Sequence, residues 1–175
     1  MGMRSAAAGD QAAAFLDFYD DALPQVYGYL AKRCGPATLA EELTAETFLA
    51  AVDAARRDDP PPISMPWVIG VARHKLADHW RRQARDERRL SVLAGESTEQ
   101  ADHWDEELDA VRVRHVLDEL AVQHRAALTL RYLDDLPVRE VAVLLHRTVH
   151  ATETLLVRAR SAFRRAYLAV EERDA

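Results

Sequence analysis

Apolar residues recur along almost the whole chain at the three- and four-residue spacing of amphipathic helices, and strictly alternating stretches are absent. The abundant Ala, Leu, Arg and Glu residues also favour helix. The N-terminal half is expected to hold three helices, at residues 10–33, 38–56 and 66–93. Pro24 is expected to start a new turn or a kink in the first helix, and Gly35-Pro36 to close it. Pro66 suits the first turn of the third. The predicted fold class is therefore all-α.

A polar, acidic stretch without periodicity follows, GESTEQADHW at residues 95–104, and we interpret it as a linker between two small helical domains. Helices are expected to resume beyond it, at residues 105–120, 122–132, 138–145 and 148–169. The predicted organisation is a flexible tail, a first domain, the acidic linker and a second domain, at residues 1–9, 10–94, 95–104 and 105–170. A chain of 175 residues is long enough for two such domains.

Charge is spread unevenly along the chain, whose formal net charge is −6. Residues 73–89 hold seven bases and three acids, and residues 125–165 hold eight bases and four acids. Between them, residues 96–109 hold seven acids and no Lys or Arg. Because the local field at a contact surface decides what binds there, the two basic islands remain candidates for nucleic-acid contact in an acidic protein.

The third expected helix, which begins PWVIGVARHKLADHWRR, has two distinct faces on a helical wheel. One face is apolar and is expected to pack on a core: Ile69, Ala72, Leu76 and Trp80. The opposite face mixes an aromatic ring with charged groups: Trp67, His74, Asp78, Arg81 and Arg85. Two interpretations of this face stay open. It is either a solvated charged face with Trp67 packed on a neighbour, or a platform where cations neutralise phosphates and a ring contacts an unstacked base.

The C-terminal stretch LPVREVAVLLHRTVHATETLLVRARSAFRR has the pattern of a helix-turn-helix, although many helical hairpins share it. The buried side of its first helix is expected at Val141, Ala142 and Leu145. The core stripe of its second helix is expected at Val149, Thr152, Leu156, Ala159 and Phe163. The surface able to enter a major groove comprises Arg147, Thr148 as N-cap, His150, Thr154, Arg158 and Ser161. Phosphate contacts are expected from Arg160, Arg164 and Arg165. His146 stands in the turn, at a position that tends to need a positive φ.

Several classes of protein are disfavoured. One cysteine, Cys34, excludes an internal disulfide and a multi-cysteine zinc site. His146 and His150 have the i, i+4 spacing of metal ligands but lack companions, so no metal or other cofactor is expected. No glycine-rich phosphate loop or nucleophile motif indicates an enzyme. No apolar run approaches the about 18 residues of a membrane span, and no secretory signal is visible, so a cytoplasmic protein is expected.

Two helical units with basic faces, joined by an acidic linker, resemble the extracytoplasmic-function group of bacterial sigma factors in the sigma-70 family. The family's acidic helix, which docks on the clamp-helix coiled coil of RNA polymerase, is similar to LAEELTAETFLAAV. Its segment that melts and reads the −10 promoter element is similar to PWVIGVARHKLADHWRR, and its −35 helix-turn-helix to the C-terminal stretch. The resemblance implies a sigma-2-like and a sigma-4-like domain, with core RNA polymerase, promoter DNA and an anti-sigma factor as partners.

The resemblance also implies roles for individual residues, and the patterns above add four more, which gives three groups of site residues. For polymerase binding, the resemblance implies Glu42 and Glu46, and the clustering of acids adds Glu41. For −10 DNA, the resemblance implies Arg73, His74, Asp78, Arg81 and Arg82, and the helical wheel adds Trp67 and Arg85. For −35 DNA, the resemblance implies Arg147, His150, Thr154 and Arg158, and the N-cap position adds Thr148. The chain departs from the family pattern at His74 (commonly Asn), at Ala45 (commonly Gln), and at Glu153 and Leu155, where Lys and Arg are usual.

Two other functions compete with a sigma factor. A transcription regulator would bind an operator through the helix-turn-helix and use the first domain as a sensor or dimerisation unit. The basic, aromatic third helix disfavours this alternative, because a sensor domain has no need of it. An enzyme is disfavoured by the missing chemical motifs.

Overall fold

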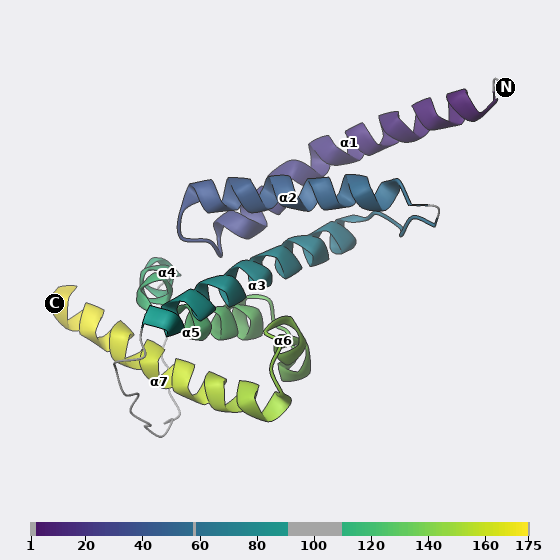
Figure 1. Ribbon diagram of the computed structural model, residues 1–175. Helices are drawn as coiled ribbons and strands as arrows, with labels where there is room; N and C mark the ends of the chain where they lie inside the picture. The colour runs from purple at the N-terminus through teal and green to yellow at the C-terminus, as the bar shows by residue number, and fades with distance from the viewer. Residues whose placement is uncertain (1–2, 58, 91–109, 175) are drawn as a thin grey trace. The chain divides into compact units, whose positions relative to one another are not determined.

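The computed structural model describes residues 3–57, 59–90 and 110–174. All regular secondary structure in these ranges is helical, which confirms the all-α prediction. The elements are α1 (Met3–Ala31), α2 (Ala37–Ala55), α3 (Met65–Leu90), α4 (Ala110–Glu119), α5 (Val122–Leu128), the π-helical turn η1 (Thr129–Leu133), α6 (Val138–Leu144) and α7 (Val149–Asp174) (Figure 1). The linker predicted at 95–104 lies outside the described residues.

Two compact units divide the chain, Met1–Leu76 and Ala77–Ala175, and the boundary falls inside the continuous helix α3. We call them unit 1 and unit 2. The division follows packing alone, so the functional domains expected at 10–94 and 105–170 stay predictions.

Helix α1 is longer than the sequence pattern predicts. It begins at Met3 and includes most of the stretch expected to be a flexible tail, 1–9. The difference has a simple cause, since this stretch is rich in alanine, the residue with the highest helix propensity. Pro24 lies inside the same helix, which continues past it to Ala31.

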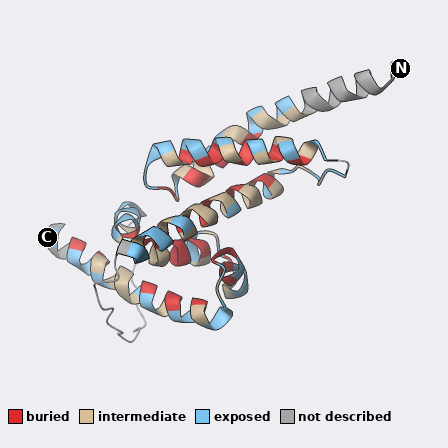
Figure 2. Ribbon diagram, viewed as in Figure 1, coloured by how far each residue is buried: buried red, intermediate tan, exposed pale blue. Residues whose placement is uncertain are grey.

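In unit 1 the helices pack through small and aromatic side chains. Helices α1 and α2 lie side by side and turn their buried faces toward each other (Figures 1 and 2). The rings of Tyr19 and Phe48 meet edge to face with centroids 4.6 Å apart. The buried hydroxyls of Thr44 and Thr47 donate to the carbonyls of Ala40 and Leu43, each at 2.6 Å, so neither leaves an unpaired polar group in the core.

Unit 2 is organised around α7, against which α4, α5 and α6 pack. One apolar cluster joins α4 to the C-terminal part of α7 through Val116, Tyr167 and Val170. A second cluster joins α4, α5 and α7 through Leu117, Leu128 and Ala159, and the partly buried Phe163 packs against both clusters. The predicted core face of α3 is present in its second half, where Trp80 is only 2% exposed.

The predicted core stripe of α7 needs one correction. Val149, expected to be buried, is 41% exposed, whereas Leu155, which was not expected in the core, is 5% exposed. Val149 is the first residue of the helix, so it lies ahead of the stretch that α5 and α6 cover. The stripe is therefore Thr152, Leu155, Leu156 and Ala159, with Phe163 half-buried beyond it.

These exposures predict opposite outcomes for two truncations on the same helix. Leu156→Ala is expected to lower the free energy of unfolding of unit 2 by about 2–5 kcal/mol, because it removes buried methyl groups and leaves a cavity. Val149→Ala is expected to change it by about 0.5 kcal/mol or less, as at an ordinary surface position. Urea unfolding followed by circular dichroism measures both. Equal losses would contradict the observed start of the packed stripe.

Candidate nucleic-acid interface

The outer face of α2 is acidic but includes one large apolar residue. Glu41 and Glu42 are exposed, whereas Glu46 is half-buried and accepts a salt bridge from Lys75, with 3.2 Å between Oε2 and Nζ. Leu49, one turn further on, is 65% exposed, and Asp53 follows it on the same face. The sequence analysis did not include Leu49 and Asp53 in the candidate polymerase-binding face. Their positions could have been predicted, because both continue the helical spacing that begins at Glu42.

The basic face of α3 begins in unit 1. His74 is exposed there, and Trp67 and Arg73 are half-buried. Ala72 and Leu76 are buried on the other side, as the wheel predicts. Val68, which the wheel did not single out, is also buried, whereas the predicted Ile69 is only half-buried. The open imidazole on this face is therefore available to a ligand, while the indole is partly packed.

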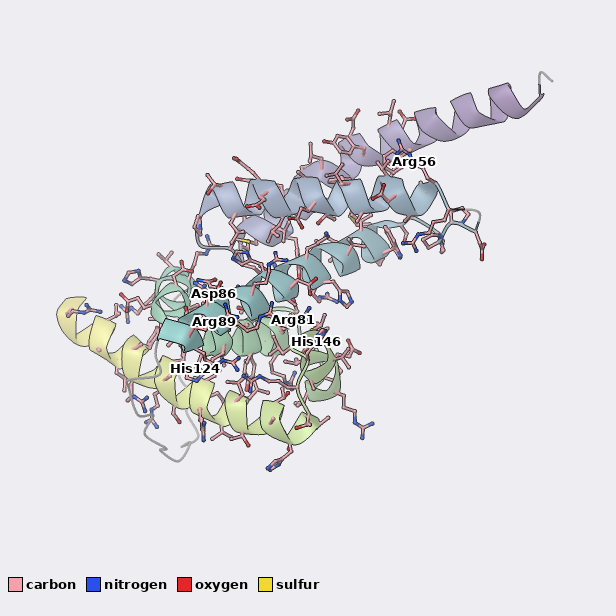
Figure 3. All side chains as sticks on the ribbon, in the orientation of Figure 1. Arg56, Arg81, Asp86, Arg89, His124 and His146 are labelled. Atoms are coloured by element: carbon pink, nitrogen blue, oxygen red, sulfur yellow. The ribbon has the colours of Figure 1, made fainter. Side chains whose placement is uncertain are left out.

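In unit 2 the basic face of α3 divides into paired and exposed cations. Arg81 forms an ion pair with Asp78 and also donates to the carbonyl of Leu144, with 2.6 Å between Nη1 and O. Arg82 and Arg85 are exposed, and no carboxylate within the described ranges pairs with either of them. Figure 3 shows Arg81 on α3, with His146 beside α6. Of these candidates, Arg82 and Arg85 are the ones whose charge is open to a phosphate.

The turn between α6 and α7 has the hydrogen bonds of a Schellman motif. The backbone N–H of Arg147 donates to the carbonyl of Ala142 at 2.9 Å, and the N–H of His146 donates to that of Val143 at 3.1 Å. His146 has a φ of 51°, so the left-handed conformation expected at this position is present. An imidazole side chain thus occupies a backbone position that favours glycine.

Helix α7 begins at a side-chain cap, as the sequence predicts. The hydroxyl of Thr148 accepts a hydrogen bond from the N–H of Ala151 at 3.1 Å. His150, Thr154 and Arg158 are exposed at i, i+4 and i+8, so the structure brings these three predicted residues onto one face. Ser161, which was predicted to share this face, is instead half-buried, and its hydroxyl donates to the carbonyl of Val157 at 3.3 Å.

Arg147 differs from the other predicted residues of this surface. It is half-buried and donates to the side-chain oxygen of Gln123 on α5, with 3.2 Å between Nη2 and Oε1. Burial, and secondly the nearby positive charge of Arg88, lower the pKa of the Arg147 guanidinium. Its charge therefore faces α3 and α5 rather than the open side of α7.

Comparisons with known proteins match both parts of the chain. The family model for sigma-70 region 2 matches residues 18–86, and the one for sigma-70 region 4 matches residues 110–163. The sigma factor SigC of Mycobacterium tuberculosis, an ECF RNA polymerase sigma factor, is 31% identical over 129 residues, which cover 70% of this chain and 67% of SigC. The chain belongs to the extracytoplasmic-function group of the sigma-70 family.

Two further comparisons give the extent of the similarity. The ECF RNA polymerase sigma factor BldN of Streptomyces coelicolor is 31% identical over 157 residues, or 85% of this chain. The alignment spans 58% of the length of BldN. Among solved structures, the sigma factor RpoE in complex with the anti-sigma factor NepR, from Bartonella quintana, has a TM-score of 0.53 at 16% identity. That match covers 87% of this chain and 96% of RpoE, and it supports the fold.

The two matched regions contain all the predicted site residues of this sigma factor. The region 2 match includes α2 and most of α3, and the region 4 match includes the helix-turn-helix of α6 and α7. The roles of the individual residues stay predictions. Within the described ranges, no three His, Cys, Asp or Glu side chains gather into a metal site. The described helices also include none that combines the length and the apolar character of a membrane-spanning segment.

The left-handed turn predicts an unusual stabilising substitution. His146→Gly is expected to raise the free energy of unfolding of unit 2 by up to about 1 kcal/mol, because glycine adopts a φ of 51° without a steric cost. Glu153→Gly is the matched control. It lies on the exposed face of α7 and is expected to lower stability by about 1 kcal/mol. Chemical denaturation of both variants measures the difference, and a loss of stability in His146→Gly would contradict strain at this turn.

Proposed function

We propose that this chain binds core RNA polymerase and directs promoter-specific transcription initiation through a −10 and a −35 element. One observation carries the proposal: a region 2 match with an acidic and a basic helix precedes a region 4 match with a helix-turn-helix in the same chain. An operator-binding regulator needs only the second of these. Because a sigma factor is a specificity subunit, the proposal assigns it no chemistry of its own and places it in the cytoplasm with the polymerase.

The polymerase-docking surface of the proposal is the outer face of α2. Its carboxylates suit basic groups on a partner, and the exposed Leu49 supplies the apolar contact that such a surface needs at its centre. Glu46 is already paired with Lys75, so Glu42 and Asp53 hold the more available charges. Glu41 lies about one helical step away from this face and contributes at its edge.

The −10 surface of the proposal is the basic face of α3. Separated DNA strands expose phosphates and unstacked bases, which require cations and flat rings along one groove. The exposed Arg82 and Arg85 supply cations, and the exposed His74 supplies a ring where family members commonly have Asn. The ion pair between Asp78 and Arg81 fixes both side chains beside them.

The −35 surface of the proposal is the exposed face of α7. Thr148 fixes the start of the helix, and His150, Thr154 and Arg158 are spaced to meet successive base edges in a major groove. Leu155, one of the departures from the family pattern, is buried and so takes no place on this face. Glu153 is exposed, and its carboxylate repels nearby phosphates.

An anti-sigma factor is part of the proposal as a regulatory partner, on the strength of the family resemblance. The direct test of the whole proposal is run-off transcription with purified core polymerase and genomic DNA fragments. A sigma factor produces defined transcripts only when core polymerase is present. A protein that binds its DNA sites equally well without polymerase, and starts no transcripts, would be an operator-binding regulator instead.

Charge reversal on α2 tests the docking surface. Glu42→Lys combined with Asp53→Lys is expected to abolish co-purification with core polymerase, because like charges across an interface oppose association. Asp17→Lys combined with Asp20→Lys reverses the same number of exposed charges on α1 and serves as the control. Circular dichroism verifies that both variants stay helical. Normal assembly of the α2 variant would show that polymerase docks elsewhere.

Two substitutions on α3 separate phosphate contact from base contact. Arg82→Ala is expected to reduce the slope of log affinity against log salt for promoter DNA by about 0.7, the value for one contact to single-stranded DNA. His74→Ala is expected to weaken binding with less effect on that slope, because its ring is proposed to contact a base rather than a phosphate. Filter binding of holoenzyme over a salt series measures both. An unchanged slope in Arg82→Ala would remove this side chain from the DNA surface.

A further inference from the structure

A basic cavity of about 220 Å³ lies within unit 2, where α3, α5, α7 and the turn before α7 meet. We call it the arginine pocket and define it by Arg81, Arg85, Arg88, Gln123, His146 and Arg147. The pocket also has an apolar wall, which includes Trp80 and Leu155. It thus combines four guanidinium groups with a hydrophobic surface in one small space.

Helix geometry explains how the cations converge. Arg81, Arg85 and Arg88 follow the i, i+4, i+7 spacing that places side chains on one helical face. The carbonyl of Leu144 accepts a hydrogen bond from Arg81, and the Glu87 carboxylate accepts one from the N–H of Val122 at 3.3 Å. These two bonds hold α3 against α5 and the end of α6. The Schellman turn then directs Arg147 toward the same space.

Among the described residues, the carboxylates compensate less than the full positive charge of the pocket. Arg81 has a carboxylate partner, Asp78. Within the described ranges, no ion pair joins Arg85, Arg88 or Arg147 to a carboxylate. Arg88 and Arg147 donate to neutral oxygens instead. Arg88 donates to the carbonyl of Ala84, and Arg147 donates to the side-chain oxygen of Gln123. Burial and the charge of Arg88 also lower the pKa of Arg147, as expected where like charges converge.

We propose that the arginine pocket binds a small anion that carries two or more linked phosphate groups. One guanidinium group can donate two parallel hydrogen bonds to two oxygens of a phosphate, which makes arginine the preferred residue for such ligands. A single phosphate ester provides a charge of about −1.5 to −2, which is less than three uncompensated cations require. Two or three linked phosphates match that charge. The cavity is too small for a duplex, and its apolar wall suits the organic part of a nucleoside polyphosphate.

The position of the pocket also predicts a consequence for transcription, and this consequence rests on the proposed function. Arg81 and Arg85 belong to the predicted −10 surface, and Arg85 is exposed there. Arg147, although predicted for the −35 surface, donates to Gln123 on α5 and turns toward the pocket. An anion held in the pocket therefore occupies Arg85, a cation that promoter phosphates would otherwise use, and competes with promoter DNA. Arg88 belongs to neither surface. It therefore reports on the anion site separately from promoter binding.

Calorimetric titration of the full chain with sodium tripolyphosphate tests the binding site. We expect a 1:1 complex that is at least tenfold tighter than the one with orthophosphate. Arg88→Gln should weaken it at least tenfold, and Arg88→Lys should weaken it less, because a charge remains. Arg89→Gln is the matched control, since it removes the same charge from the next residue of α3, which is exposed and outside the pocket. Circular dichroism of each variant verifies its fold.

Two results of this titration would overturn the proposal. Equal weakening by Arg88→Gln and Arg89→Gln would mean that tripolyphosphate is attracted by net charge alone. Single-stranded DNA that binds as tightly, with the same dependence on Arg88, would make the pocket a part of the DNA surface. A comparison of ATP with tripolyphosphate identifies the source of the phosphates. Tighter binding of ATP supports a nucleotide ligand, and equal binding supports an inorganic chain.

Run-off transcription tests the consequence. Tripolyphosphate is expected to inhibit promoter-specific transcription by the unaltered chain more strongly than by Arg88→Gln, under identical magnesium concentrations. Equal inhibition would overturn the competition, because it would come from the polymerase or from chelation of magnesium. If no defined transcript forms with either chain, the proposed function fails, whereas the titration still decides whether the anion site exists.

Discussion

The direction in which α7 leaves α6 depends on one left-handed residue, His146. Its φ of 51° allows the two backbone hydrogen bonds of the Schellman motif to form at the end of α6, and α7 then starts at the Thr148 cap. With that direction fixed, the buried stripe of α7 packs on α5 and α6, and the opposite side remains exposed. The same turn directs Arg147 inward. The exposed face of α7, which is proposed to face DNA, and the arginine pocket therefore share one structural origin, and the strain at His146 is offset by the packing of the helices that it joins.

Helix α3 shows how a single periodicity serves two purposes. Its apolar positions Ala72, Leu76 and Trp80 are buried in succession, so the helix contributes to the cores of both units. Because these positions repeat with the helical period, the charged residues between them accumulate on the other side. The basic face is thus a geometric consequence of the buried one. Periodicity does not determine which charged residue occupies these positions. The chain has arginine at several of them, and its planar, permanently charged group can donate two parallel hydrogen bonds to a phosphate.

The features that follow from local pattern could be predicted from the sequence, and those that depend on packing could not. The all-α class, the buried face of α3, the Thr148 cap and the positive φ of His146 all arise within one or two helical turns. The burial of Leu155 in place of Val149 depends on where neighbouring helices cover α7, which a helical wheel does not contain. Likewise, the pairing of Glu46 with Lys75 joins two helices that are separated in sequence.

A surface that binds DNA must keep its cations free of internal partners, and this requirement has a cost in the unbound protein. Paired arginines, such as Arg81 with Asp78, are stable in isolation but offer less charge to a phosphate. Arginines without carboxylate partners, such as Arg85 and Arg88, offer their full charge but repel one another where a fold brings them together. That repulsion makes such a cluster attractive to any compact polyanion that fits between the side chains. The proposed promoter binding and the proposed small-anion binding would then both draw on this one arrangement of charge.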